Sequence, residues 1–369
     1  MLLAGAHDPA YIDEHAARRF RNHVLMALKD SAACTPEMLT VVYLAYVMRR
    51  VRRKLEKDFA GTDVDASFAT CVPVDQVQNS AVMAAFGRVA SAAERVERQA
   101  LDNEPLRGWL DRARSALSEP VLSSSEAKLH LVPEAVAATA GYVRSHERAS
   151  GIHALVDIGN GTTDISIVNI HDVLGRDPET SWYAARSIPR GTAYVEMHLA
   201  DEIEKTGRAA KQSEILDLMN GIGGKLATAR DVIREELTAI WDRTRAVWSE
   251  AHLHLRTEQQ WKGSAVRIFL AGGGAMITGA TTVFQESWMQ SPNWGPYPCA
   301  LVPDPEGYDD RVVGGPFVRI CVAYGLTTPL PELGKWVLPN DVRDHTPLSL
   351  PRREIAYDGD QLVPRPGWV

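Results

Sequence analysis

Two aspartates enclose a glycine-rich turn near the middle of the chain, a pattern that could hold a phosphate group. Residues 152–170 read Ile-His-Ala-Leu-Val-Asp-Ile-Gly-Asn-Gly-Thr-Thr-Asp-Ile-Ser-Ile-Val-Asn-Ile, which is an apolar strand, the turn and a second apolar strand. Gly159 and Gly161 let the backbone approach an anion closely, and the N–H groups of the turn can point at phosphate oxygens. Asp157 ends the first strand, where it could hold a magnesium ion or its water shell. The pattern predicts a phosphate-holding hairpin, and with it a bound nucleotide.

A second glycine-rich segment lies further along the chain. It reads Val266-Arg-Ile-Phe-Leu-Ala-Gly-Gly-Gly-Ala, a short strand that runs into Gly272, Gly273 and Gly274 and is then expected to enter a helix. Three glycines remove the side chains that would block a ribose or an α-phosphate, and the following helix would aim its positive end at them. This geometry also suits nucleotide binding.

Together, in this order and separated by a mostly helical insert, the two segments resemble the second phosphate loop and the adenosine loop of the actin-like ATPase superfamily. That superfamily includes DnaK-type heat-shock chaperones, actins and plasmid-segregation actins. Three further segments agree with it: Ser67-Phe-Ala-Thr-Cys-Val-Pro, Leu131-Val-Pro-Glu-Ala-Val-Ala-Ala-Thr-Ala-Gly-Tyr and Val322-Ala-Tyr-Gly-Leu. The resemblance spans roughly residues 35–328 and implies an α/β fold with two lobes around a nucleotide cleft.

The resemblance also implies roles for individual residues. ATP and Mg²⁺ would be the ligands, with Glu134 orienting or deprotonating the attacking water and Asp157 positioning magnesium as a catalytic residue and metal ligand. The implied nucleotide contacts are Gly159, Asn160, Gly161, Thr162, Thr163, Gly191, Gly272, Gly273 and Gly274. Pro133 precedes Glu134, an order closer to the plasmid-segregation actins than to the chaperones. Asp164 has a structural alternative, because an aspartate that closes such a turn often accepts backbone N–H groups.

One part of the family pattern has no counterpart in the sequence. The first phosphate loop, which in the family lies on an opening hairpin near the N-terminus, matches nothing before Asp157. In the family those opening strands pair with the strand that here is predicted at residues 66–72, so this strand would have an open edge. We therefore expect an N-terminally incomplete first lobe, completed by the first thirty-odd residues, by a missing segment or by a protein partner.

The order of the predicted elements favours two lobes and a tail. Residues 1–150 are expected to form the first lobe, with residues 1–34 unassigned, a helix from Thr35-Pro36 and a loop-rich stretch at 101–126. Residues 151–328 would form the second lobe, with a largely helical insert at about 171–263. The remaining residues, 329–369, are rich in proline and leave no room for the substrate domain of the chaperones.

Composition limits the class of protein. The chain has 369 residues, of which 45% are hydrophobic and 24% charged, which are ordinary globular values, and it has no apolar run of about 20 residues that could span a bilayer. A formal charge of −7 argues against broad nucleic-acid affinity. Four widely spaced cysteines form no metal or disulfide framework. We expect a cytoplasmic protein without a membrane or nucleic-acid partner.

These observations predict an ATP-binding, DnaK-like ATPase domain that hydrolyses ATP slowly and couples it to lobe closure. Three alternatives remain open. The Pro-Glu order and the missing substrate domain favour a filament-forming segregation actin. The missing first loop favours a nucleotide-binding pseudoenzyme or partner-binding module, since phosphoryl transfer needs charge stabilisation on both sides of the phosphate. Sugar and acetate kinases share the lobes, but no residues indicate an acceptor site.

Overall fold

The computed structural model describes residues 34–99, 105–123, 126–171, 179–222, 226, 228–254, 261, 266–287 and 295–342. The chain divides into two compact units: residues 1–72 with 76–133, and residues 73–75 with 134–369. Each unit combines strands and helices, so the predicted α/β fold is confirmed. The predictions for the N-terminal segment before Cys34 and for the tail after Val342 lie outside the described residues. No helix in the described ranges is long and apolar enough to cross a membrane.

Within the described residues, the first unit has the helices α3 (Pro36–Asp58), α4 (Ser80–Gln99) and α5 (Leu106–Leu117). The α3 helix starts where predicted, because the Thr35 side chain accepts a hydrogen bond from the Met38 N–H at 3.3 Å. The prediction of a loop-rich stretch at 101–126 was wrong, since α5 occupies much of it. Trp109, Leu110, Ala113 and Ala116, spaced by one to three residues, form its buried face against α3 and α4.

Two parallel strands, β1 (Phe68–Val72) and β2 (Leu129–Pro133), complete the first unit. Buried Glu94 of α4 accepts the N–H groups of Lys128 and Leu129, both at 2.8 Å, and so fixes the start of β2. Among the described residues β1 pairs with β2 alone. What covers its other edge, a segment of this chain or a partner, stays a prediction.

The second unit is built on a six-stranded sheet with the order β7-β6-β3-β4-β5-β8. Strands β3 (Gly151–Ile158) and β4 (Thr163–His171) form the predicted hairpin, and β6 (Val266–Ala271) is the predicted strand before the three glycines. β4 is antiparallel to β3 and β5, whereas β6 runs parallel to β3. The remaining strands are β5 (Glu179–Ile188), β7 (Cys299–Leu301) and β8 (Lys335–Val337).

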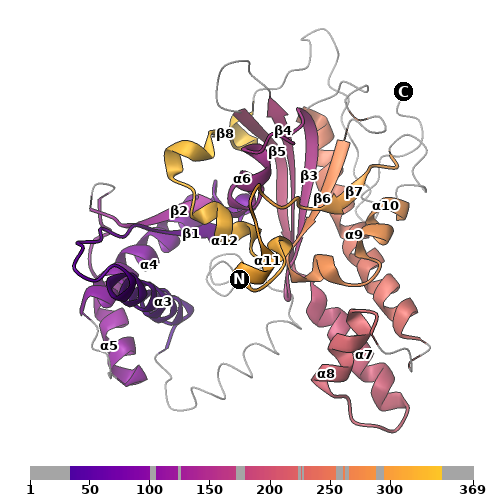
Figure 1. Ribbon diagram of the computed structural model, residues 1–369, viewed down its shortest axis with the longest axis horizontal. Helices are drawn as coiled ribbons and strands as arrows, with labels where there is room; N and C mark the ends of the chain where they lie inside the picture. The colour runs from indigo at the N-terminus through magenta and orange to yellow at the C-terminus, as the bar shows by residue number, and fades with distance from the viewer. Residues whose placement is uncertain are drawn as a thin grey trace. The chain divides into compact units, whose positions relative to one another are not determined.

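Helices cover both faces of this sheet. Figure 1 shows α9 (Ala229–His254) and α10 (Ala280–Glu286) on one side, and α6 (Glu134–Val143) and α12 (Cys321–Leu326) on the other. Alternate residues of β3 face the two layers, as the period of a strand requires. Ile152, Ala154, Val156 and Ile158 enter the core with α9. His153 lies on the other face, where its Nε2 is 3.1 Å from the Tyr142 hydroxyl of α6.

This packing explains where the second unit begins. The Tyr142 ring also contacts Phe269 of β6 edge-on, with 4.7 Å between ring centroids. A Cβ on Gly325 of α12 would lie 1.8 Å from the Ala137 carbonyl oxygen, so the two helices cross at a distance that only glycine permits. Helix α6 therefore belongs to the second unit, although the predicted lobe boundary followed it at residue 150.

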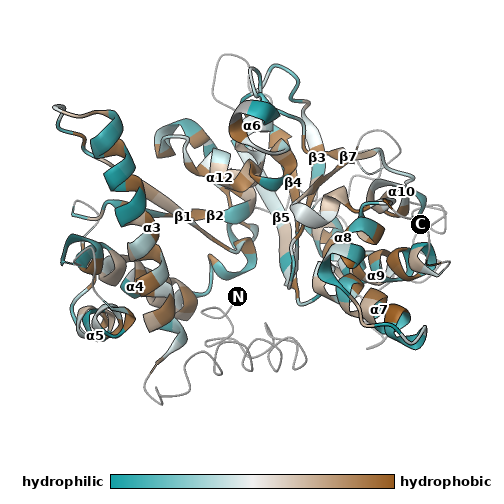
Figure 2. Ribbon diagram, turned by 60° about the horizontal axis from the view of Figure 1, so that its bottom comes forward, coloured by the Kyte–Doolittle hydropathy of each residue, from teal (hydrophilic) through white to brown (hydrophobic). Residues whose placement is uncertain are grey.

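Two segments predicted from composition are different in the structure. The stretch 171–263 contains α7 (Thr192–Lys205), α8 (Gln212–Met219) and α9, but it opens with the sheet strand β5. Figure 2 shows α7 and α9 with hydrophilic and hydrophobic residues along their lengths, as amphipathic helices have. The predicted tail supplies β8, whose Lys335–Val337 pair with Glu179–Ser181 of β5. In both cases the strand is defined by its pairing with another strand, which the local sequence does not reveal.

Short elements complete the described chain. They are η2 (Val74–Gln76), η5 (Gly273–Met276), α11 (Asp310–Val313), η7 (Phe317–Arg319), η8 (Leu330–Leu333) and η9 (Pro339–Asp341). The helix expected directly after the three glycines is only the single turn η5, and α10 starts later, at Ala280. The positive end of a long helix is therefore not aimed at this loop.

Candidate functional site

The two glycine-rich loops lie side by side because their strands are parallel neighbours. Asp157 of β3 is in register with Ala271 of β6, so the turn after β3 and the loop after β6 leave the sheet at the same edge. The carboxyl ends of parallel strands are the usual place for ligands in α/β sheets. All the residues of this site described below belong to the second unit.

The surroundings of the three consecutive glycines differ in whether they leave room for a side chain. Gly272 has a φ of +79°, and a Cβ there would lie 2.2 Å from Asp157 Oδ1. A Cβ on Gly274 would lie 2.3 Å from Ile158 Cγ2. A Cβ on Gly273 would meet no atom within 4 Å. Gly272 and Gly274 are therefore required by packing, whereas Gly273 faces open space that a ligand can use.

The turn between β3 and β4 presents backbone donors. The Gly159 N–H donates to the Thr162 carbonyl at 2.9 Å and closes the turn. Within the described part of the chain, no hydrogen bond engages the N–H groups of Asn160, Gly161 and Thr162. Successive backbone N–H groups of this kind form an anion-binding concavity. The hydroxyl of Thr163 donates to the Arg190 carbonyl at 2.8 Å, so this side chain supports the turn.

Gly191 lies against the same turn. A Cβ on Gly191 would lie 2.4 Å from the Gly159 carbonyl oxygen and 2.6 Å from that of Asn160. The next two N–H groups, of Thr192 and Ala193, donate to these carbonyls at 3.0 and 2.9 Å. The sequence predicted Gly191 near phosphates. The structure adds that the Gly191 backbone packs directly against the turn, at a distance that leaves no room for a side chain.

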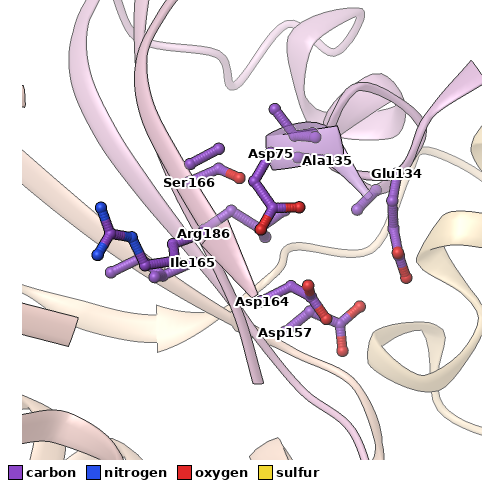
Figure 3. A pocket seen from close by; sticks show the side chains of 12 residues that line it. Asp75, Glu134, Ala135, Asp157, Asp164, Ile165, Ser166 and Arg186 are labelled. Carbon is purple, nitrogen blue, oxygen red and sulfur yellow. The ribbon is translucent and has the colours of Figure 1, made fainter. Parts of the chain in front are cut away.

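Four carboxylates surround one small pocket beside the turn. Asp75, Glu134, Asp157 and Asp164 line it together with apolar residues of α6 and the sheet, and Figure 3 shows their side chains around a common space. Asp157 and Asp164 are cross-strand partners, which places their Cβ atoms about 5 Å apart. The enclosed part has room for about one water molecule. The pocket is therefore a carboxylate cluster rather than a cavity of nucleotide size.

Burial makes three of these carboxylates, Asp157, Glu134 and Asp164, weaker acids. It raises the pKa of Asp157 to about 6, and burial followed by the charges of Asp157 and Asp75 raises the pKa of Glu134 to about 7. Burial and then the charge of Glu134 hold the pKa of Asp164 well above its ordinary value. A carboxylate whose pKa lies near neutrality can exchange protons at physiological pH. Glu134 is thus chemically suited to accept a proton from water.

Asp75 is the site residue that the sequence did not single out. It lies in η2, directly after the end of β1, and its Oδ2 accepts the Ser187 N–H of β5 at 3.0 Å. Its local signal was an acidic residue just beyond the Val72-Pro73 strand end. That signal is common, and only the fold shows that this segment reaches the β5 strand.

The donors of the site fit magnesium bound through water. In the described ranges, no group of three or more His, Cys, Asp or Glu side chains is placed to hold a metal ion directly. Mg²⁺ usually keeps several waters and is bound by one or two carboxylates together with phosphate oxygens. Asp157 and its neighbour Asp164 offer such carboxylates beside the N–H groups of the turn. The predicted Asp157 role is therefore compatible with a water-mediated contact.

No protein-family model and no curated protein matches this sequence. Among solved structures, MreB5 of Spiroplasma citri bound to AMPPNP matches with 13% identity and a TM-score of 0.42, over 76% of this chain and 73% of that one. The same protein bound to ADP gives 13%, 0.41, 76% and 72%. The ethanolamine utilization protein EutJ from Carboxydothermus hydrogenoformans gives 16%, 0.41, 78% and 73%. At such identities and TM-scores, function has to be derived from the strand order and side chains of this chain.

Proposed function

We propose that this chain is an actin-like ATPase domain that binds Mg·ATP and hydrolyses it slowly. One observation carries the proposal: the glycine-rich turn, the Gly272–Gly274 loop and four carboxylates meet at one edge of one sheet. The turn supplies N–H groups for phosphate, and the open side of Gly273 supplies space for the nucleoside. The carboxylates supply groups that position water and exchange protons.

The proposed chemistry assigns one task to each side chain. Glu134, at the first turn of α6, accepts the proton of the water that attacks the γ-phosphate, for which a pKa of about 7 is well matched. The N–H groups of the turn and the Thr162 hydroxyl bind phosphate oxygens. When bound, Mg²⁺ would neutralise charge between β- and γ-phosphates. Asp157 would hold the water shell of the ion, and Asp164 would support it from the opposite strand.

The charge of the buried carboxylates should make nucleotide binding depend on Mg²⁺. Ionised Asp157, Asp164 and Glu134 repel one another, and burial makes that repulsion costly. Mg·ATP would therefore meet carboxylates that either hold protons or carry an excess of negative charge, which the cation would balance. We expect nucleotide affinity to depend steeply on Mg²⁺. A lobe movement read by a protein partner would be the output, as in a chaperone-type switch.

Calorimetry of ATP binding, with and without Mg²⁺, tests the proposal on the whole chain and on Gly273→Val. A Cβ added at Gly273 would meet no atom within 4 Å, so this variant should keep its melting temperature while losing ATP affinity by at least tenfold. Asp157→Ala should lose the Mg²⁺ dependence. Binding that is equal in the wild type and both variants would place the nucleotide elsewhere. A folded wild type that binds no nucleotide would contradict the proposal.

Phosphate release and sedimentation then separate the finer assignments. Slow release that is lost in Glu134→Gln supports the ATPase, whereas binding without release in the wild type indicates a pseudoenzyme. Nucleotide-dependent pelleting would replace the chaperone-like switch by a filament-forming actin. Phosphate release separates an ATPase from a pseudoenzyme, and pelleting independently separates a switch from a filament former.

A further inference from the structure

Glu236 is a buried carboxylate on α9, outside the acidic pocket. Only 3% of its surface is exposed, and both of its oxygens have partners. Arg190 donates to Oε2 from Nε at 3.1 Å and from its terminal nitrogen at 2.5 Å. The ring Nδ1 of His198, on α7, lies 2.6 Å from Oε1. The Glu236 carboxylate of α9 thus contacts both Arg190, which precedes α7, and His198, which lies within α7.

Arg190 leads from this carboxylate to the glycine-rich turn. It lies between β5 and α7, and its guanidinium also packs over the Tyr194 ring, 4.7 Å from the centroid. Its carbonyl accepts the hydroxyl of Thr163, the fully buried first residue of β4, at 2.8 Å. The residue after Arg190 is Gly191, whose backbone packs against the glycine-rich turn. A shift of Arg190 would therefore move the two groups that flank the turn.

The start of α7 holds the turn directly. The N–H groups of Thr192 and Ala193 bind the carbonyls of Gly159 and Asn160, and the Thr192 hydroxyl lies 3.3 Å from Asn160 Oδ1. The first N–H groups of a helix have no partner within the helix and are free for such a contact. They hold the carbonyls of the turn on the α7 side, while the N–H groups of Asn160, Gly161 and Thr162 have no acceptor among the described residues. The turn is therefore preset for an anion by the position of α7.

Apolar packing alone would keep α7 on α9. Val195, Leu199 and Ile203 of α7 lie in one core cluster with Ile233, Leu237 and Ile240 of α9. A buried ion pair adds little net stability, but it can fix one arrangement among several that apolar packing allows. The Glu236 contacts are consequently better suited to set the position of α7 than to attach it.

We propose that Glu236 is the positioning residue of the glycine-rich turn, acting through Arg190 and the first residues of α7. Its effect on ligand affinity rests on the proposed function of the turn, whereas its effect on the turn itself does not. Loss of the carboxylate charge would release Arg190, let the start of α7 shift, and loosen the turn carbonyls from Thr192 and Ala193.

Hydrogen exchange on the ligand-free chain tests the positioning step, with Glu236→Gln compared with wild type. We expect exchange in peptides covering residues 189–196 to quicken at least tenfold, while the β3 and β6 peptides keep their rates. Arg190→Lys keeps the positive charge but loses the paired donors, so it should increase exchange at residues 189–196 by a smaller factor. This second variant keeps the test valid if Glu236→Gln does not fold. The matched control is Glu250→Gln, whose carboxylate pairs with Arg186 at 3.1 Å and also joins α9 to β5. The side chains of Glu250 and Arg186 are both exposed, so we expect no change in hydrogen exchange at residues 189–196.

ATP affinity in the presence of Mg²⁺ gives the second readout. A tenfold loss in Glu236→Gln, with none in Glu250→Gln, supports the proposal in full. Unchanged exchange at residues 189–196 in a folded Glu236→Gln overturns it. Faster exchange in a chain whose wild type binds no nucleotide would support the positioning role and contradict the proposed function. Faster exchange with unchanged affinity would overturn the link between the turn and the ligand.

Discussion

Replacement of Glu134 by glutamine is expected to stabilise the second unit, and to do so more as the pH rises. The Glu134 pKa is about 7 in the folded chain, against an ordinary value of 4.5. The folded state therefore binds more protons than the unfolded state between these values, and stability falls as pH rises through that window. The full cost of the ionised group, reached above pH 7, is about 3 kcal/mol.

The same values give the size of the effect at each pH. At about pH 5 the unfavourable contribution of Glu134 is roughly 1 kcal/mol, and at about pH 8 it is roughly 3 kcal/mol. Glutamine carries no charge, so Glu134→Gln should remove both. It also removes a charge that raises the pKa of Asp164, which works in the same direction. The difference between the two pH values, about 2 kcal/mol, is the quantity to measure.

Urea unfolding followed by tryptophan fluorescence is a suitable assay. Of the nine tryptophans, all but Trp109 belong to the second unit, so the signal reports the unit that contains Glu134. Glu332→Gln is the control, because the Glu332 side chain is exposed and pairs with Arg144 on the surface. It should change stability by less than about 0.5 kcal/mol at either pH. A Glu134→Gln chain that is equally or less stable than wild type at both pH values would refute the reasoning.

Three further substitutions are predicted from the packing of single residues. His153 is buried and neutral, with a pKa lowered to about 4 by burial, so its own contribution to stability should fall as pH drops from 6.5, opposite in direction to that of Glu134. His153→Gln should remove roughly 2 to 3 kcal/mol of this loss between pH 7 and 4.5, measured by urea titration. Gly272→Ala should lower the melting temperature because of its positive φ and the close carboxylate, whereas Gly273→Ala should not, and equal effects in thermal unfolding would contradict the packing assignment. Gly325→Ala should destabilise the second unit by about 1 to 3 kcal/mol by forcing α12 from α6, with Gly315→Ala, which meets no atom within 4 Å, as the tolerated comparison.

Much of the fold and the site follows from local sequence signals. The hairpin around Gly159 and Gly161, the strand before Gly272 and the start of α3 at Thr35 are all encoded within short windows. Short apolar runs, glycines at tight turns and a capping threonine are local signals that favour these conformations within a few residues. The helix that starts at Glu134 was predictable for the same reason.

Strand pairing was the main feature that the sequence did not reveal. β5 and β8 show no clear alternation of apolar and polar residues. β5 is a strand because it pairs with β4 along Glu179–Ile188, and β8 is a strand because Lys335–Val337 pair with Glu179–Ser181 of β5. A helix was also missed: α5 was predicted as part of a loop-rich, polar stretch. Its buried face consists of Trp109, Leu110, Ala113 and Ala116. Such elements are stabilised by partners distant in sequence, which override weak local preference.

The sequence by itself determined which residues could bind phosphate and where the chain turns, since these depend on residue type and spacing. Only the tertiary structure decided that Asp75 joins Glu134, Asp157 and Asp164, and that Gly273 alone among its neighbours faces open space. It also decided the acidity of the carboxylates, because a pKa is set by burial and by charges brought together from distant parts of the chain. Residue identity supplies a functional group, and its surroundings in the fold determine its proton affinity and its neighbours.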